Sequence, residues 1–508
     1  MNVPSTRGLG ARRGGLVGGL LLGVVVVALL VPFLGADPSR QVTSSNARDT
    51  DEGFNLANAR QWALFGEFAT GDVDRSLTNG AYSAIAGAVF AVTEPTLAIG
   101  RGVSVAAIAV AVVLLAVGLA ETLGLAAALL AAAALAGANL TLEYGRLGMV
   151  EPTAIAFLTA GFVLAVRALR TRSPLAGAGC GLALAAAISV KAIAVLPALA
   201  MLAVLLGPAL WRRDRPAVLA GLAALGAALA AAALWVLLVA LPNLDRLRTN
   251  LEIWPSVRYP TTPAGVVRRL DQYASFSDHA ITRSSLLLMA AVLGVALLVL
   301  RWRSLERAAR ETLVMAGLWG FGLWLAIAVG SYSPNRYIVP ALPGLAVLAG
   351  FGLAALVAPL RRGRAAALVA VGLLVAVPGA ARYLNDAVDS GRQRERDQAI
   401  LAAALPPDAV VFGAYAPTLL FDTKAELLTL WPSAGANRDD PVARFGVTHV
   451  LASAVGDRSD PTLTIPALRP LRFAVGGTRV RWGRHTLQLL DVAATAPPGP
   501  APPQRPAP

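Results

Sequence analysis

The stretch LVGGLLLGVVVVALLVPFL occupies residues 16–34 and contains no charged side chain. A membrane-spanning helix needs about 20 consecutive, mostly apolar residues, so this stretch is long enough to cross a bilayer. Arg12 and Arg13 precede it. A cleaved signal peptide also starts with basic residues, but its apolar core is shorter and a small-residue cleavage site follows. The apolar run is long and no such site clearly follows, so we favour a retained first membrane helix.

Further apolar stretches follow along the whole chain and indicate a polytopic α-helical membrane protein with about eleven transmembrane helices. The chain has 508 residues, of which 56% are hydrophobic and only 15% are charged. Soluble domains carry about 25% charged residues, and disordered chains are far less apolar, so both classes are excluded. The other ten stretches lie near residues 101–119, 123–140, 152–168, 175–190, 192–210, 216–241, 284–300, 312–330, 337–358 and 365–380.

The formal net charge of +14 would suggest a nucleic-acid partner in a soluble protein. Here the arginines gather in short clusters between apolar stretches, and the positive-inside rule places such clusters in the cytoplasm. This requires an even number of crossings between clusters, so residues 175–210 must form two helices that turn near Ser189–Lys191. We therefore expect no nucleic-acid partner, a plasma-membrane location, a cytoplasmic N-terminus and an extracytoplasmic C-terminus. The clusters lie at residues 12–13, 167–172, 212–215, 301–303 and 361–364.

The composition also predicts how the chain is divided into domains. Residues 1–385 form the transmembrane domain, and residues 386–492 form a small extracytoplasmic α/β domain in which Pro, Asp and Arg return. Residues 493–508 form a Pro-rich tail that we expect to be disordered. The transmembrane domain has outer loops at 36–100, 141–151 and 242–283. The α/β domain has expected strands at 408–415, 426–431 and 447–453, helices at 393–404 and 438–445, and a hairpin or meander over 471–492 around Gly476-Gly477.

Two acidic features lie on the predicted outer side. Asp51 and Glu52 begin a helical stretch and could supply a base or bind a metal, although they could equally cap a helix in water. Glu151 precedes Pro152 and is predicted to be the N-cap of the fourth helix, where the helix dipole stabilises an anion. Arg146 is close enough in sequence to pair with Glu151 or with a phosphate; the alternative is an ordinary cap and an interfacial arginine.

Two basic features lie on the same side. Lys191 stands within an apolar run, where an ionisable residue is a functional candidate, although at a turn it could reach the lipid surface instead. Arg336 and Tyr337 open the tenth helix; arginine binds phosphate oxygens with two parallel hydrogen bonds, and the alternative is an interfacial Arg-Tyr belt.

The order of these residues resembles that of the GT-C superfamily of membrane glycosyltransferases, specifically the protein mannosyltransferase and aminoarabinose–lipid A transferase relatives. In these relatives an Asp-Glu pair and a downstream Ala-Arg follow the first helix, as Asp51-Glu52 and Ala59-Arg60 do here. An Arg–Met–acid–Pro pattern is matched by Arg146, Met149, Glu151 and Pro152, and a later lysine by Lys191. An Arg-Tyr-x-x-Pro-x-x-Pro segment is matched by Arg336, Tyr337, Pro340 and Pro343.

The resemblance implies a glycosyltransferase that takes a sugar from a polyprenyl-phosphate donor to a lipid, glycan or protein acceptor, with inversion. It implies Asp51 as the base, Glu52 as its helper and Glu151 as an orienting acid, with Lys191, Arg336, Arg146 and Tyr337 around the donor phosphate. A divalent cation, if one is used, would be held by Asp51 and Glu151. A transporter or lipid flippase, and a non-enzymatic envelope assembly protein, are the alternatives. We expect the C-terminal domain to recognise the acceptor or to act as a lid.

Overall fold

The computed structural model describes residues 6–39, 51–68, 71–252, 259–276, 278–331, 334–360, 362–430, 439–453, 462–473, 476–482 and 485–493. The predicted disorder of the tail concerns residues that lie almost entirely outside these ranges. The chain divides into two compact units. The first contains residues 1–34, 101–242 and 256–389, and the second contains residues 35–100, 243–255 and 390–508. The domain boundaries expected from composition stay predictions.

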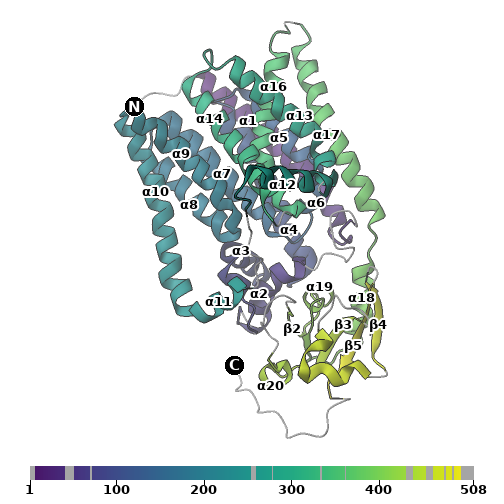
Figure 1. Ribbon diagram of the computed structural model, residues 1–508. Coiled ribbons are helices and arrows are strands. Elements are labelled where there is room, and N and C mark those ends of the chain that lie inside the picture. The colour runs from purple at the N-terminus through teal and green to yellow at the C-terminus, as the bar shows by residue number, and fades with distance from the viewer. Residues whose placement is uncertain are drawn as a thin grey trace. The chain divides into compact units, whose positions relative to one another are not determined.

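The first unit is built entirely from helices in the described residues (Figure 1). The break between α5 and α6 bends the chain by 58°, and short π-helical segments follow α10 and α14 at Val236–Ala240 and Leu318–Gly322. The helices are α1 (Thr6–Leu30), α4 (Leu97–Leu119), α5 (Leu125–Gly137), α6 (Asn139–Gly145), α7 (Val150–Thr171), α8 (Pro174–Val190), α9 (Val195–Trp211), α10 (Arg215–Trp235), α12 (Pro263–Phe276), α13 (Asp278–Leu300), α14 (Arg307–Gly317), α15 (Leu323–Val329), α16 (Leu342–Val357) and α17 (Arg364–Asp389).

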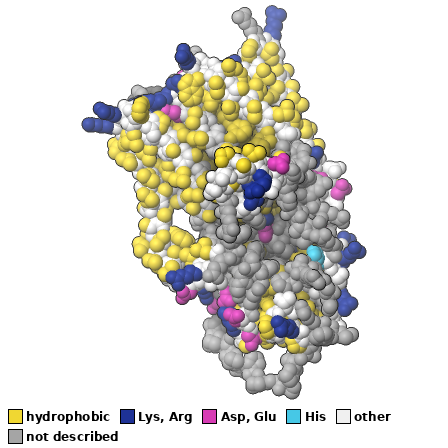
Figure 2. All heavy atoms as spheres, in the orientation of Figure 1, with side chains coloured by type: hydrophobic (Ala, Val, Ile, Leu, Met, Phe, Trp, Pro, Cys, Tyr) yellow, Lys and Arg dark blue, Asp and Glu magenta, His cyan; other side chains and the backbone are white. Residues whose placement is uncertain are grey.

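Each of the eleven predicted apolar stretches coincides with a helix. In the described part of the chain, eight helices are long and apolar enough to cross a membrane, and the bent pair α5–α6 makes nine. The remaining two stretches are shorter apolar helices, Pro174–Val190 and Ser284–Leu300. Hydrophobic side chains dominate the visible face of these helices in Figure 2, as expected for a surface that faces lipid. The chain is a multi-pass membrane protein.

Small residues allow the helices of the first unit to approach closely. A Cβ atom added to Gly177 or Gly181 in α8 would collide with the backbone carbonyl of Ala220 or Ala224 in α10. Lipid tails are as apolar as leucine side chains, so close van der Waals packing of this kind, rather than the hydrophobic effect, holds membrane helices together. The α16 helix lies at the centre of the unit. It belongs to the apolar span Asn335–Val357, and 94% of the residues in the most apolar part of this span are buried.

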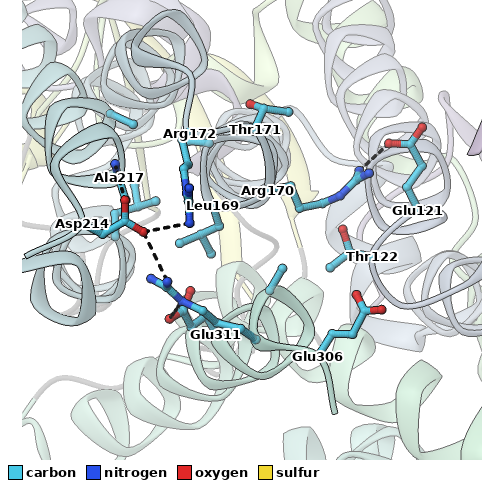
Figure 3. Close-up of a pocket in the computed structure, with 15 residues that line it drawn as sticks. Glu121, Thr122, Leu169, Arg170, Thr171, Arg172, Asp214, Ala217, Glu306 and Glu311 are labelled. Atoms are coloured by element: carbon cyan, nitrogen blue, oxygen red, sulfur yellow. Dashed lines mark hydrogen bonds and ion pairs between the residues drawn. The ribbon is translucent and has the colours of Figure 1, made fainter. Parts of the chain in front are cut away.

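The charged ends of several helices meet at one end of the first unit. Glu121 pairs with Arg12 and Arg170, Asp214 pairs with Arg172 and Arg307, and Glu311 pairs with Arg212 and Arg307. Many of these groups surround a pocket of about 480 Å³ (Figure 3). Four of the five basic clusters used to predict the topology therefore border, or lie next to, the same end of the helix bundle. Arg361 of the fifth lies outside the described residues.

The second unit combines the first polar loop with the C-terminal segment. Its five strands form one sheet in the order β2-β1-β3-β5-β4, in which β1 is parallel to β2 and β3 while β5 is antiparallel to β3 and β4. Neighbouring residues such as Val411 and Phe412 belong to separate apolar clusters, so both faces of the sheet are covered. The elements are α2 (Asp51–Phe65), α3 (Gly80–Phe90), α11 (Leu244–Glu252), α18 (Gln393–Ala402), β1 (Val410–Phe412), α19 (Ala416–Leu419), β2 (Glu426–Leu428), α20 (Pro441–Phe445), β3 (His449–Ser453), β4 (Thr478–Trp482) and β5 (His485–Asp491).

The predicted α/β character of the C-terminal segment is confirmed, but the position of its hairpin turn is wrong. Trp482 pairs with His485, so the chain reverses after Trp482 and not at Gly476-Gly477. The two glycines instead precede β4, where Gly477 adopts a φ of +90°. The first three residues of the expected hairpin, 471–473, instead end the 3-10 helix Pro466–Phe473.

Candidate active site

Glu151 is the acidic centre of the candidate site in the first unit. It is the second residue of α7, because Met149 and not Glu151 is the N-cap residue. An anion in the first turn of a helix is still stabilised by the helix dipole. The side chain of Glu151 is fully buried, and its Oε2 atom has no hydrogen-bond partner among the described residues. A buried carboxylate of this kind is costly unless cations compensate its charge.

Lys191 supplies one of these cations. The α8 helix ends at Val190, and Lys191 adopts an extended conformation with φ −156° and ψ 117° before the chain continues into α9. This break confirms the predicted turn. The Lys191 Nζ atom forms an ion pair with Oε1 of Glu151 and lies 4.1 Å from the centroid of the Tyr337 ring. The side chain is only 12% exposed, so its negative partner is a protein carboxylate.

Arg336 supplies the second cation from a different part of the chain. Arg336 and Tyr337 lie in the 3-10 helix Asn335–Ala341, which leads into α16. The Nε atom of Arg336 lies 3.8 Å from Oε1 of Glu151, and its guanidinium carbon lies 5.7 Å from the centroid of the Tyr337 ring. Four of the residues predicted from sequence therefore converge: Glu151, Lys191, Arg336 and Tyr337. We call this set the Glu151 cluster.

The Glu151 cluster has a surplus of positive charge. One carboxylate faces one ammonium and one guanidinium group, so the three charges sum to one net positive charge. Tyr337 places its ring beside both cations, and cation–π attraction is strengthened where water is excluded. The arrangement can bind an anion, and arginine together with lysine is well suited to phosphate oxygens.

Arg146 is held by different contacts. It follows α6, is 2% exposed, and donates a hydrogen bond from Nη1 to the carbonyl oxygen of Phe33 at 3.1 Å. Arg101 makes a similar bond to the carbonyl oxygen of Leu34 at 2.5 Å. These arginines bind the end of the segment that leaves the first membrane helix. This hydrogen bond ties Arg146 to the segment after the first membrane helix, and the suggested pairing of Arg146 with Glu151 or with a phosphate stays a prediction.

Asp51 and Glu52 belong to the second unit. The α2 helix begins at Asp51, as predicted, and both acids lie in its first turn. Asp51 is partly buried and Glu52 is fully buried. Their expected convergence with Glu151 joins two units that are described separately, so it stays a prediction.

Sequence reasoning missed several polar residues around α2. Arg75 donates hydrogen bonds to Asn55 and Asn58 at 2.9 Å, and its guanidinium carbon lies 4.5 Å from the centroid of the Phe54 ring. No motif marks Arg75 in the sequence. The only signal is that Asn55 and Asn58 lie on one side of α2, which indicates that this side contacts polar groups.

The described residues contain no group of three or more His, Cys, Asp or Glu side chains arranged to hold a metal ion. The pair named for a divalent cation, Asp51 and Glu151, is divided between the two units. No ready-made ligand set therefore supports a step through a metal, and a divalent cation stays a proposal.

Comparison with solved structures identifies the architecture. ArnT from Cupriavidus metallidurans in the apo state matches with a TM-score of 0.62 and 16% identity, covering 95% of this chain and 99% of that chain. The same protein bound to undecaprenyl phosphate matches with a TM-score of 0.61 and 16% identity, over 94% and 99% of the two chains. The fold is that of the GT-C glycosyltransferases.

The GT-C fold is also shared with a more distant protein. An oligosaccharyltransferase from Archaeoglobus fulgidus, tethered to an acceptor peptide, matches with a TM-score of 0.54 and 11% identity, over 87% of this chain and 69% of that chain. No protein-family model and no curated protein matches the sequence. At these identities the likeness establishes the fold, and the chemistry must be argued from the site.

Proposed function

We propose that this GT-C-fold protein is a glycosyltransferase that uses a polyprenyl-phosphate-linked sugar as donor. The Glu151 cluster is the observation that carries the proposal. It places a buried, net positive group at the ends of apolar helices, and an amphipathic donor requires this combination. The polyprenyl tail can lie in lipid while the phosphate meets Lys191 and Arg336. One of the matching proteins is itself bound to undecaprenyl phosphate.

The reaction is a single displacement at the anomeric carbon. An acceptor hydroxyl oxygen forms the new bond to this carbon, and the bond from the carbon to the donor phosphate oxygen breaks. The hydroxyl proton passes to the carboxylate of Asp51, and the bonding electrons leave with the polyprenyl phosphate. One displacement inverts the configuration. Since negative charge develops on the phosphate, Lys191 and Arg336 stabilise the transition state more than the ground state.

The remaining candidates support these groups. Glu52 orients Asp51, Tyr337 holds the two cations in place, and Arg146 steadies the segment beside the site. Glu151 fixes Lys191 and Arg336, and its second oxygen is available to accept a hydrogen bond from the donor sugar or the acceptor. We place the reaction on the extracytoplasmic side of the plasma membrane, because the arginine clusters favour a cytoplasmic location for the opposite helix ends. The acceptor is a lipid, a glycan or a protein.

The direct test is an assay of the purified protein with a panel of polyprenyl-phosphate sugars and acceptors, with products identified by mass spectrometry. We expect sugar transfer from at least one polyprenyl-phosphate donor and none from nucleotide sugars. Movement of the intact lipid across a vesicle membrane without sugar transfer would favour a flippase and contradict the proposal. The ionisable groups of the Glu151 cluster favour the transferase, because they stand at helix breaks and helix starts.

The base assignment has its own test. We expect Asp51→Asn to lower the turnover number by at least about a hundredfold, since general-base catalysis contributes about 10²–10⁴-fold. Asp245→Asn is the matched control, because Asp245 lies in the same unit with a fully solvated side chain. Full activity of Asp51→Asn would refute the assigned base.

A further inference from the structure

The α2 helix, which carries Asp51 and Glu52, is bound by the C-terminal part of the chain within the second unit. Arg60 lies on α2 and is fully buried. Its Nε atom donates to the carbonyl oxygen of Phe421 at 2.7 Å, and its Nη2 atom donates to the carbonyl oxygens of Thr423 and Ala425 at 2.6 and 2.8 Å. Three backbone carbonyls therefore converge on one guanidinium group.

Two further bonds attach α2 to the same segment. Gln61 donates from Nε2 to the carbonyl oxygen of Leu427 at 2.9 Å, and the backbone N–H of Gly53 donates to Oγ1 of Thr418 at 3.2 Å. Gly53 also lies so close to the backbone of Pro417 that an added Cβ atom would collide with it. The attachments thus extend from the first turn of α2 to its third. We call residues 417–427 the α2 seat.

The α2 seat is itself fixed to the sheet. Its last residues enter β2, which pairs with β1. Both terminal nitrogens of Arg394 donate to Oδ2 of Asp422 at 3.0 Å, and Oδ1 of Asp422 accepts from the backbone N–H of Leu97 at 2.6 Å. A pocket of only about 20 Å³, which is about the size of one water molecule, lies between α2 and β2.

The chemistry of Arg60 suits a fixed support. Burial lowers the pKa of Arg60 to about 9, an effect that the nearby charges of Asp422 and Glu426 partly oppose. Arg60 keeps its proton at neutral pH, and its charged donors are satisfied by fixed backbone carbonyls. A planar guanidinium group can reach several acceptors at once, whereas a lysine ammonium acts as a point charge.

We propose that the C-terminal domain positions the Asp51–Glu52 pair for catalysis, with Arg60 as the positioning residue that connects α2 to the α2 seat. The inference rests on the proposed function, because it takes Asp51 as the base. It assigns the C-terminal domain a part in the catalytic machinery besides any contact with the acceptor. Loss of Arg60 releases α2, so the base is poorly placed in the transition state although the donor still binds.

The test combines hydrogen exchange with kinetics on the full-length protein. In Arg60→Gln we expect the amides of α2 to exchange at least about tenfold faster, because the buried carbonyls lose their charged donor. We expect kcat to fall at least about tenfold with the donor KM within about twofold, the pattern of an interaction needed in the transition state. Arg60→Lys should not restore either quantity. Arg396→Gln, at an exposed position of α18, is the control and should leave both unchanged.

Several outcomes would overturn the inference. Unchanged α2 exchange in Arg60→Gln would do so, as would a raised donor KM with normal kcat. If Arg60→Gln does not fold, Gln61→Leu removes the hydrogen bond to Leu427 and the one that Gln61 accepts from Arg60. We expect smaller changes of about threefold in the same two quantities; no change in either would overturn the proposal. The exchange result is independent of activity, so it tells a failure of this inference from a failure of Asp51 as base.

Discussion

At the residue scale, the Glu151 cluster contains three charges that the sequence separates widely. Glu151 and Lys191 are 40 positions apart, and Arg336 lies much later in the chain, in the 3-10 helix Asn335–Ala341. The ordered set of motifs could be recognised in the sequence. The sequence could not show that Lys191 and Arg336 both pair with the Oε1 atom of Glu151. The cause is geometric: the break at Lys191 and the 3-10 segment at Arg336 bring both cations to the start of α7.

Lys191 gives a prediction at this scale. Charge-assisted hydrogen bonds contribute about 1.5–3 kcal/mol, so Lys191→Met should weaken the binding of polyprenyl phosphate by about 10–100-fold. Native mass spectrometry or a fluorescence titration in detergent measures this dissociation constant. The only other lysine, Lys424, is exposed in the second unit, and Lys424→Met should bind normally. Equal binding by both variants would show that Lys191 does not meet the phosphate.

At the element scale, the helices could be predicted because long apolar runs have few alternatives in a membrane protein. The separation of α8 from α9 required the positive-inside argument, since the apolar run across Lys191 is nearly continuous. The strands of the C-terminal segment were predicted from short apolar runs, but the reversal after Trp482 was missed. The Gly476-Gly477 pair resembles a turn, and a local pattern does not show that β4 begins only after it. The attachment of α2 to the α2 seat could not be predicted, because Arg60 binds carbonyl oxygens that carry no side-chain signature.

The contact between α8 and α10 gives a prediction at the element scale. Gly181→Ala places a methyl group against the carbonyl of Ala224, and overpacking of this kind costs about 1–3 kcal/mol of unfolding free energy. Gly226→Ala in α10 is the matched control, because a Cβ atom there meets nothing within 4 Å. Thermal unfolding of the two variants in detergent should show a lower midpoint for Gly181→Ala only. Equal midpoints would contradict the close-packing account.

At the scale of the whole molecule, the candidate site and the arginine clusters of the first unit lie at opposite ends of α7. The pocket in Figure 3 is bordered by helix ends from α4, α7, α10 and α14, and its ion pairs connect these ends. The Glu151 cluster lies at the start of α7, while Arg170 and Arg172 lie at its end. One helix therefore separates the proposed chemistry from the basic surface.

Cysteine labelling of intact cells tests which surface faces the cytoplasm. In a Cys180→Ala background, Ser304→Cys beside the basic end should react with a membrane-impermeant reagent only after the cells are permeabilised. Asp408→Cys in the C-terminal domain should react without permeabilisation. Both positions are exposed, and the native Cys180 is buried. The reverse pattern would invert the proposed orientation.

The long-range bond of Arg60 has a consequence for how the protein is made. Arg60 and its partner Phe421 are 361 positions apart, so the ribosome must synthesise most of the chain before the partner exists. Domains generally fold as units during synthesis, with N-terminal parts first. Until residues 421–425 have been synthesised, the Arg60 side chain on α2 has none of these carbonyl acceptors. If Asp51 and Glu52 act as proposed, the acid pair is therefore held in place only after the chain has been synthesised beyond residue 427.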